Sequence, residues 1–265
     1  MTDGNNDMKE TDEQQTSGAP EELRRVGADE TYSDKRITAK RLVGFWHYGV
    51  ILTYIALVLG VVSISFSAMG KTGIAVVLLM AAGLCDAFDG LVAKSRKNRS
   101  QADRSFGIQI DSLSDVINFG VAPIMIGLSL GLKSWYFIII YVLFVLCALV
   151  RLGYYNVRET EKMYDGDTSR SKAFEGMPVT NISLVMPLFY MAATMAAATL
   201  DAHYGSIAVQ CIMAFLYVVY AALMVIRFRM PKPRVRNLII IICCFSAVMV
   251  AMFCVRWFVV GIHSL

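Results

Sequence analysis

Charged residues are scarce in this chain. Asp, Glu, Lys and Arg make up 17% of its 265 residues, whereas apolar residues make up 56%. Soluble domains average about 25% charged and about 45–50% apolar residues. The composition therefore favours a membrane protein over a soluble one.

Cysteines in paired spacing are also lacking. The chain has six cysteines, and all of them fall inside apolar runs and not in loops. This placement is typical of small buried side chains and argues against both disulfides and a zinc site. The six residues are Cys85, Cys147, Cys211, Cys243, Cys244 and Cys254.

The first 44 residues contain no apolar run and are rich in charged residues, Gly and Thr. A secretory signal needs an apolar segment, so we expect residues 1–32 to be a disordered cytoplasmic tail instead. Residues 33–47 mix cations with Val43, Phe45 and Trp46. This mixture predicts a juxtamembrane amphipathic segment at the headgroup surface; a plain flank with one interfacial Trp is the alternative.

Long apolar runs dominate the rest of the chain. A spanning helix needs about 20 mostly apolar residues, and seven segments qualify with some tolerance. They predict an all-α fold, namely a polytopic membrane helix bundle. Its six core helices are expected within residues 48–228, and a basic loop with a seventh span is expected at 229–265. The segments are 47–69, 72–93, 107–131, 134–157, 177–200, 204–226 and 237–262.

Basic residues gather in four regions of the chain. Seven lie in the N-terminal tail, and five lie in each of 94–106, 151–178 and 227–236. Seven spans place these regions on one side of the membrane and the connections near residues 70, 132 and 202 on the other. Because basic loops stay in the cytoplasm, we predict that this side is cytoplasmic and that the C-terminus lies outside.

Four aspartates interrupt the second and third apolar runs: Asp86, Asp89, Asp111 and Asp115. An ionised Asp at the centre of a membrane helix costs about 2.5–3.5 kcal/mol. These groups therefore require protonation, pairing with cations, or bound metal. The members of each pair are three or four residues apart, so each pair shares one helix face.

If the two spans are antiparallel neighbours, the four carboxylates meet and repel one another unless divalent cations neutralise them. All-oxygen ligation suits Mg²⁺ or Mn²⁺, and a two-metal cluster is typical of displacement at phosphorus. An ion-coupled transporter also places aspartates inside a membrane. The carboxylates lie near one face of the membrane and not at its midplane, and no inverted repeat is seen in the sequence. Both observations favour an enzyme that acts at phosphorus over a transporter.

Small residues lie on or beside the carboxylate faces, where a missing side chain leaves room for a phosphate or a nucleotide. Close helix packing is the alternative explanation. The residues are Gly83, Gly90, Ala93 and Gly107. Two further glycines, Gly127 and Gly131, are interpreted as packing residues.

Together these residues resemble the signature of the CDP-alcohol phosphatidyltransferase family, D-x2-D-G-x2-A-R, a spacer, then G-x3-D-x3-D. The chain reads DAFDGLVAK over 86–94 and continues with G-x3-D-x3-D over 107–115. Lys94 stands where the family usually has Arg, and the spacer 95–106 is longer than usual. Lys keeps a positive charge near a phosphate but lacks the bidentate fork of Arg, and Arg96 is an alternative phosphate contact.

The resemblance implies a homodimeric membrane enzyme that moves a phosphatidyl group from CDP-diacylglycerol to an alcohol, with two Mg²⁺ or Mn²⁺ ions per active site. It implies that Asp86, Asp89, Asp111 and Asp115 bind the metals and that Asp111 and Asp115 are catalytic, Asp115 as the general base. It also implies nucleotide contacts, which are Gly90, Ala93, Lys94 and Gly107.

Three further runs, 109–123, 150–156 and 174–180, resemble those family members that use L-serine and release phosphatidylserine and CMP. Arg151 is then a candidate partner for the serine carboxylate, with a positive-inside anchor as the alternative, and Asn118 is a second polar candidate. The signature itself leaves inositol and glycerol 3-phosphate open as acceptors. The longer spacer is shared with some bacterial members, which implies a bacterial cell membrane.

Overall fold

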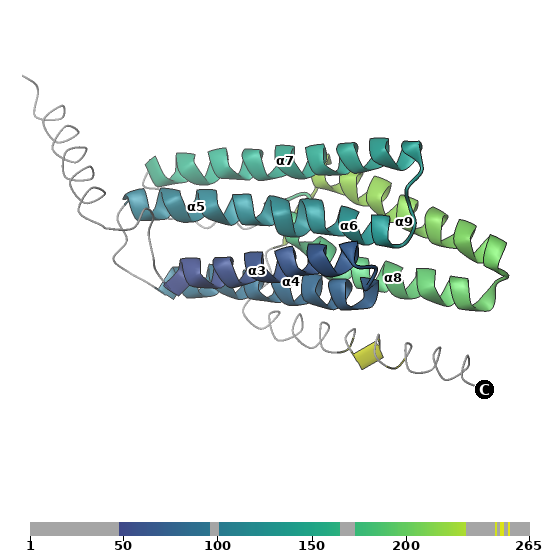
Figure 1. Ribbon diagram of the computed structural model, residues 1–265. Coiled ribbons are helices and arrows are strands. Elements are labelled where there is room, and N and C mark those ends of the chain that lie inside the picture. Colours follow the sequence, from purple (N-terminus) through teal and green to yellow (C-terminus); the bar gives the residue numbers. More distant parts are fainter. Residues whose placement is uncertain are drawn as a thin grey trace, which may run out of the picture. The chain divides into compact units, whose positions relative to one another are not determined.

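The computed structural model of the protein describes residues 48–95, 101–164 and 173–231, together with positions 247, 250, 251 and 254. The predicted tail and amphipathic segment, residues 1–47, and almost all of the predicted span 237–262 lie outside this part. The described chain is a bundle of long helices, which confirms the predicted all-α fold (Figure 1). Its long helices are α3 (Tyr48–Ala68), α4 (Thr72–Ser95), α5 (Gln101–Asp115), α6 (Ala122–Ser129), α7 (Trp135–Tyr164), α8 (Ile182–Thr199) and α9 (Ala202–Val225).

Six helical segments in the described chain are long and apolar enough to cross a membrane. They agree in position with the first six predicted spans, although the third begins at Asp103 and not at residue 107. The protein is therefore a multi-pass integral membrane protein. The segments are Val50–Ala68, Thr72–Asp89, Asp103–Ser129, Trp135–Glu161, Val179–Thr199 and Ala202–Val225.

One face of α7 shows why the bundle requires lipid around it. Ile138, Val142, Leu146 and Val150 follow one another at every fourth residue, and they are 58%, 53%, 49% and 62% exposed. Such a stripe on a helix is apolar surface that water would disfavour and hydrocarbon accepts. Trp135, at the start of the same helix, is 73% exposed, as expected for a residue at the membrane interface.

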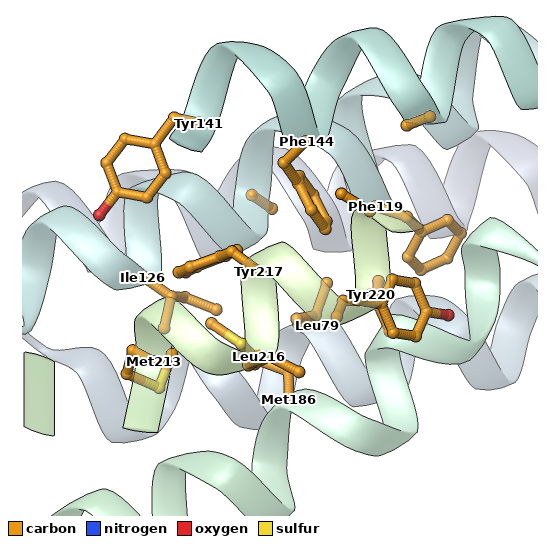
Figure 2. Packing of buried hydrophobic residues seen from close by; sticks show 14 of the residues in the cluster. Leu79, Phe119, Ile126, Tyr141, Phe144, Met186, Met213, Leu216, Tyr217 and Tyr220 are labelled. Atoms are coloured by element: carbon orange, nitrogen blue, oxygen red, sulfur yellow. The ribbon is translucent and has the colours of Figure 1, made fainter. Parts of the chain in front are cut away.

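The core of the bundle forms where α9 packs against α7 and α8, and where α4 packs against α8. Figure 2 shows Tyr217 of α9 at its centre, beside Tyr141 and Phe144 of α7. Their rings meet that of Tyr217 edge to face, with centroids 5.3 and 5.4 Å away. The Tyr217 hydroxyl donates a hydrogen bond of 2.6 Å to the carbonyl oxygen of Pro123, so α9 is tied to α6 as well as to α7.

The two glycines interpreted as packing residues differ. A Cβ at Gly127 would lie 2.6 Å from the Tyr141 hydroxyl and 2.7 Å from that of Tyr217, which confirms the packing role. At Gly131 a Cβ would meet nothing within 4 Å, and the backbone φ is +89°. The packing interpretation is therefore wrong for Gly131, which is a glycine because it ends α6 in a left-handed turn.

The third span is not a regular α-helix. The π-helix η1 (Val116–Val121) lies between α5 and α6 and buries Asn118, Phe119 and Gly120. Figure 1 shows α5 and α6 nearly in line on either side of it. Pro123 lies two residues after the end of η1 and has no backbone N–H to donate, which weakens the α-helical pattern at this point. Such short π-helical turns occur often at functional sites.

Two short strands were not predicted. β1 (Ala173–Glu175) pairs antiparallel with β2 (Arg229–Pro231), with Phe174 opposite Met230. Gly176 follows β1 with a φ of +73°, and its backbone N–H donates to the Phe228 carbonyl at 2.7 Å. The pairing joins the segment before α8 to the segment after α9 at one end of the bundle.

Candidate active site

Three of the predicted carboxylates converge in the structure. One oxygen from each of Asp86, Asp89 and Asp111 lies within 4.8 Å of the others. Asp86 and Asp89 share one face near the end of α4, which forms the second span. Asp111 lies in α5, which forms the first half of the third span. Because consecutive spans run in opposite directions, the end of the second span and the beginning of the third lie at the same end of the bundle.

Asp115 joins the same group through a different partner. Its carboxyl group lies close to that of Asp86, just as that of Asp111 lies close to that of Asp89. Asp115 is only 7% exposed. Ionised carboxylates only accept hydrogen bonds, so groups this close to one another require a proton or a cation between them.

The donor set fits a hard divalent cation. All its atoms are carboxylate oxygens, which Mg²⁺ and Mn²⁺ prefer. The Oδ1 atom of Asp111 is buried and has no hydrogen-bond partner among the described residues. Buried polar atoms are nearly always satisfied, so this oxygen has the property expected of a ligand atom.

Two other predicted site residues carry orphaned atoms as well. The Oδ1 atom of Asn118 and the Nε atom of Arg151 are buried without a hydrogen-bond partner in the part of the chain described here. Only one further side-chain atom, Oγ of Ser67, shares this property in that part. Three of the four orphaned atoms thus belong to residues that the sequence singled out for binding.

The helix α3 supplies a residue that sequence analysis missed. The Thr53 hydroxyl donates a hydrogen bond of 2.9 Å to Oδ2 of Asp89, and both side chains are buried. α3 packs against both α4 and α5, whereas α4 and α5 make few close backbone contacts with each other. The carboxylates of α4 and α5 therefore approach one another although the two backbones are not closely packed, and α3 lies beside them.

Asn118 lies one turn beyond Asp115, within η1. It is fully buried, and its Nδ2 atom donates to the Ser114 hydroxyl at 3.2 Å. A Cβ at Gly60 of α3 would lie 2.7 Å from Cγ of Asn118. Gly60 is therefore the residue that lets α3 approach the π-helix closely.

Two hydrogen bonds connect the three serine-type runs of the sequence. Ser112, between two site aspartates, donates at 2.7 Å to Oδ1 of Asn156 on α7. Arg151, five residues earlier on α7, donates through Nη2 at 3.1 Å to the carbonyl of Gly176. Its guanidinium also lies over the ring of Tyr155, 4.4 Å from the centroid. The runs 109–123, 150–156 and 174–180 are thus joined side to side.

Comparison with known families agrees with this arrangement. Residues 46–264 match the family model described as CDP-alcohol phosphatidyltransferase. The chain belongs to this family. The match extends through the last predicted span, beyond the region that carries the signature.

Several curated relatives of this chain carry serine in their names. The CDP-diacylglycerol–serine O-phosphatidyltransferase of Saccharomyces cerevisiae is 41% identical over 110 residues, which cover 41% of this chain and 38% of the yeast protein. The archaetidylserine synthase of Methanothermobacter thermautotrophicus is 33% identical over 153 residues, 57% of this chain and 61% of that protein.

A CDP-diacylglycerol–serine O-phosphatidyltransferase of Helicobacter pylori is 30% identical over 143 residues, which cover 52% of this chain and 54% of that protein. In each of these comparisons the matched segment covers less than two thirds of the relative's own length.

The small residues on or beside the carboxylate faces have different surroundings. A Cβ at Gly107 would meet nothing within 4 Å, so this part of α5 has open space beside it. A Cβ at Gly83 would lie 2.5 Å from Cβ of Ser183, so close packing of α4 against α8 accounts for Gly83. Gly90, Ala93 and Lys94 belong to the last turns of α4, whose side chains lie outside the described part.

Proposed function

We propose that this protein transfers a phosphatidyl group from CDP-diacylglycerol to the hydroxyl of L-serine, giving phosphatidylserine and CMP. The observation that carries the proposal is the convergence of Asp86, Asp89 and Asp111 at one end of the bundle. Family membership supports phosphatidyl transfer, and the names of the relatives support serine as the acceptor.

Asp86, Asp89, Asp111 and Asp115 are the proposed ligands of two Mg²⁺ or Mn²⁺ ions. When bound, the ions supply charge neutralisation for the pyrophosphate and for the oxygens that attack and leave. The carboxylates hold this charge at a fixed place inside the protein, where electrostatic interactions are stronger than in water. The open space beside Gly107 suits the nucleotide, with Gly90, Ala93 and Lys94 as its further proposed contacts.

Asp115 is the proposed general base. It receives the proton of the serine hydroxyl as the hydroxyl oxygen forms a bond to the phosphorus that carries diacylglycerol. The bond from this phosphorus to the bridging oxygen breaks, and CMP leaves with the electron pair. A base must lie within hydrogen-bonding reach of the proton that it takes, and Asp115 reaches the cluster through its contact with Asp86.

Arg151 is the proposed partner of the serine carboxylate. Its Nε atom is buried without a hydrogen-bond partner among the described residues, while Nη2 is held by Gly176. A guanidinium with a free Nε edge suits a carboxylate, which Arg binds through paired hydrogen bonds. Asn118 is the second proposed polar contact of serine, although its oxygen, orphaned within the described part, faces Gly60 of α3 in this structure.

The proposed site faces the cytoplasm. Thr53 lies near the end of its span that adjoins the basic N-terminal tail, Asp89 lies near the basic region 94–106, and Arg151 and Gly176 lie within the basic region 151–178. The positive-inside rule assigns this side to the cytoplasm. We further propose a homodimer, on family resemblance alone; light scattering of the purified protein in detergent tests it.

Acceptor competition tests the proposed function. The full-length protein in detergent receives CDP-diacylglycerol, Mn²⁺ and radiolabelled serine, with unlabelled inositol or glycerol 3-phosphate as competitors. We expect labelled phosphatidylserine and stoichiometric CMP, undiminished by either competitor, and no CMP release in excess EDTA. Preferred use of inositol or glycerol 3-phosphate would replace serine as the acceptor, and turnover in EDTA would remove the metals from the proposal.

A further inference from the structure

The hydroxyl group of Thr53 is the feature of the site that the signature does not include. Thr53 lies near the beginning of α3 and is 6% exposed. Its Oγ1 donates to Oδ2 of Asp89 across 2.9 Å, from one span to the next. Several hydroxyls in the bundle bond within their own helix, as Ser65 does to Val61 and Thr194 to Tyr190, whereas that of Thr53 bonds to a carboxylate of the acidic cluster on a neighbouring span.

A donor at this position constrains the Asp89 side chain. A carboxylate on a short side chain can rotate about two bonds, and each of its oxygens accepts hydrogen bonds. Asp89 contacts Asp111 of α5 as well as Thr53 of α3. With one oxygen held by Thr53, the plane of the carboxylate is fixed relative to both neighbouring helices.

The backbone arrangement makes this constraint consequential. α3 packs against α4 and α5, whereas α4 and α5 make few close backbone contacts with each other, and acidic side chains of both helices meet beside α3. Asp89 alone would repel Asp86 and Asp111 and could turn away from them. A hydrogen bond from α3 opposes that rotation.

We propose that Thr53 is a positioning residue for the metal-binding carboxylates, and that it acts by holding Asp89 in the orientation that meets Asp86 and Asp111. This role rests on the proposed function, because it presupposes that these carboxylates bind a divalent cation. Outer-sphere partners of metal ligands typically contribute about 10–100-fold to metal affinity, which sets the size of the expected effect.

The test measures Mn²⁺ binding without turnover. Full-length protein in detergent is titrated with Mn²⁺, and free Mn²⁺ is followed by electron paramagnetic resonance. Thr53→Val keeps the shape of the side chain and removes the donor, and we expect it to weaken Mn²⁺ binding about 10-fold or more. Thr53→Ser keeps the donor and should bind Mn²⁺ close to the wild-type affinity.

Ser63→Ala is the matched control. Ser63 is also buried in α3 and donates to the carbonyl of Ala75 on α4 at 2.7 Å. It lies ten residues, roughly 15 Å, further along the helix. Its removal therefore deletes a buried α3–α4 hydrogen bond away from the acidic cluster, and we expect a lower melting temperature with unchanged Mn²⁺ affinity.

The outcomes separate the two proposals. Wild-type affinity in Thr53→Val, or equal losses in Thr53→Val and Ser63→Ala, would overturn the positioning role and leave the proposed function intact. Absence of Mn²⁺ binding by the wild-type protein would overturn both. If Thr53→Val does not fold, Thr53→Ala replaces it, since it also lacks the donor and adds no bulk; wild-type affinity there would equally overturn the role.

Discussion

Gly107 is a position where the demands of folding and of ligand binding separate. A methyl group there meets no protein atom within 4 Å, and Ala is favoured over Gly inside a helix by about 1 kcal/mol. Gly107→Ala should therefore leave the melting temperature unchanged or raise it. Gly107 lies one turn before Asp111 on α5, so the new methyl group would face the proposed nucleotide.

Overpacking of a filled site costs about 1–3 kcal/mol, which corresponds to about 5–150-fold in binding. We therefore expect KM for CDP-diacylglycerol to rise by a factor in this range. The assay is CMP release against CDP-diacylglycerol concentration in mixed micelles, with a thermal melt of the same preparation. A stable Gly107→Ala variant with wild-type KM and kcat would refute the placement of the nucleotide beside Gly107.

Gly83→Ala is the reciprocal control. Its methyl group would lie 2.5 Å from Cβ of Ser183 on α8, so one helix must move. We expect the melting temperature to fall while the folded fraction keeps its KM. A raised KM with an unchanged melting temperature would instead assign Gly83 to the ligand.

Four other substitutions test separate parts of the protein. Asp111→Asn and Asp115→Asn should each lower CMP release by at least about 100-fold, the usual scale of a lost acid–base group, while the melting temperature stays unchanged. Wild-type-like turnover in either variant would show that the substituted aspartate is not catalytic. Arg151→Gln should raise KM for serine more than KM for CDP-diacylglycerol, and equal increases would make Arg151 an anchor. Gly127→Ala should lower the melting temperature by crowding two tyrosine hydroxyls, and an unchanged melt would contradict the packing at α6.

The spans and the acidic residues were predictable from the sequence because their signals are local. An apolar run of span length is visible without knowledge of its neighbours, and the spacing of Asp86 and Asp89, or of Asp111 and Asp115, fixes a shared helix face. The convergence of Asp86, Asp89 and Asp111 confirms the contact between the two faces. The chemical roles of these residues remain predictions.

Thr53 could not be identified in the same way. A threonine in an apolar run has no distinctive pattern, and its partner Asp89 is 36 residues away. The same reason applies to Ser112 and Asn156, whose hydrogen bond joins α5 to α7. A hydrogen bond between spans depends on how the helices are rotated, and periodicity within one helix does not contain this information.

Glycines show the limit of residue type as evidence. Gly83 and Gly107 both lie on or beside a carboxylate face in the sequence, yet one packs against Ser183 and the other has open space beside it. Gly127 and Gly131 have the same spacing as a packing motif, and only Gly127 packs. The reason why a glycine is required at a given position depends on the neighbouring helix or on the backbone angle. The residue type alone reveals neither of them.

The π-helix η1 has a consequence for how this span tolerates change in length. A π-helical turn holds one more residue than an α-helical turn, and each residue of an α-helix advances by about 100°. Deleting one residue within Val116–Val121 would therefore restore a regular helix and leave Asp111 and Asp115 in nearly the same orientation relative to the buried residues of α6. A one-residue deletion in the first turn of α6 has no such extra residue to remove and would rotate the acidic groups by about a quarter turn.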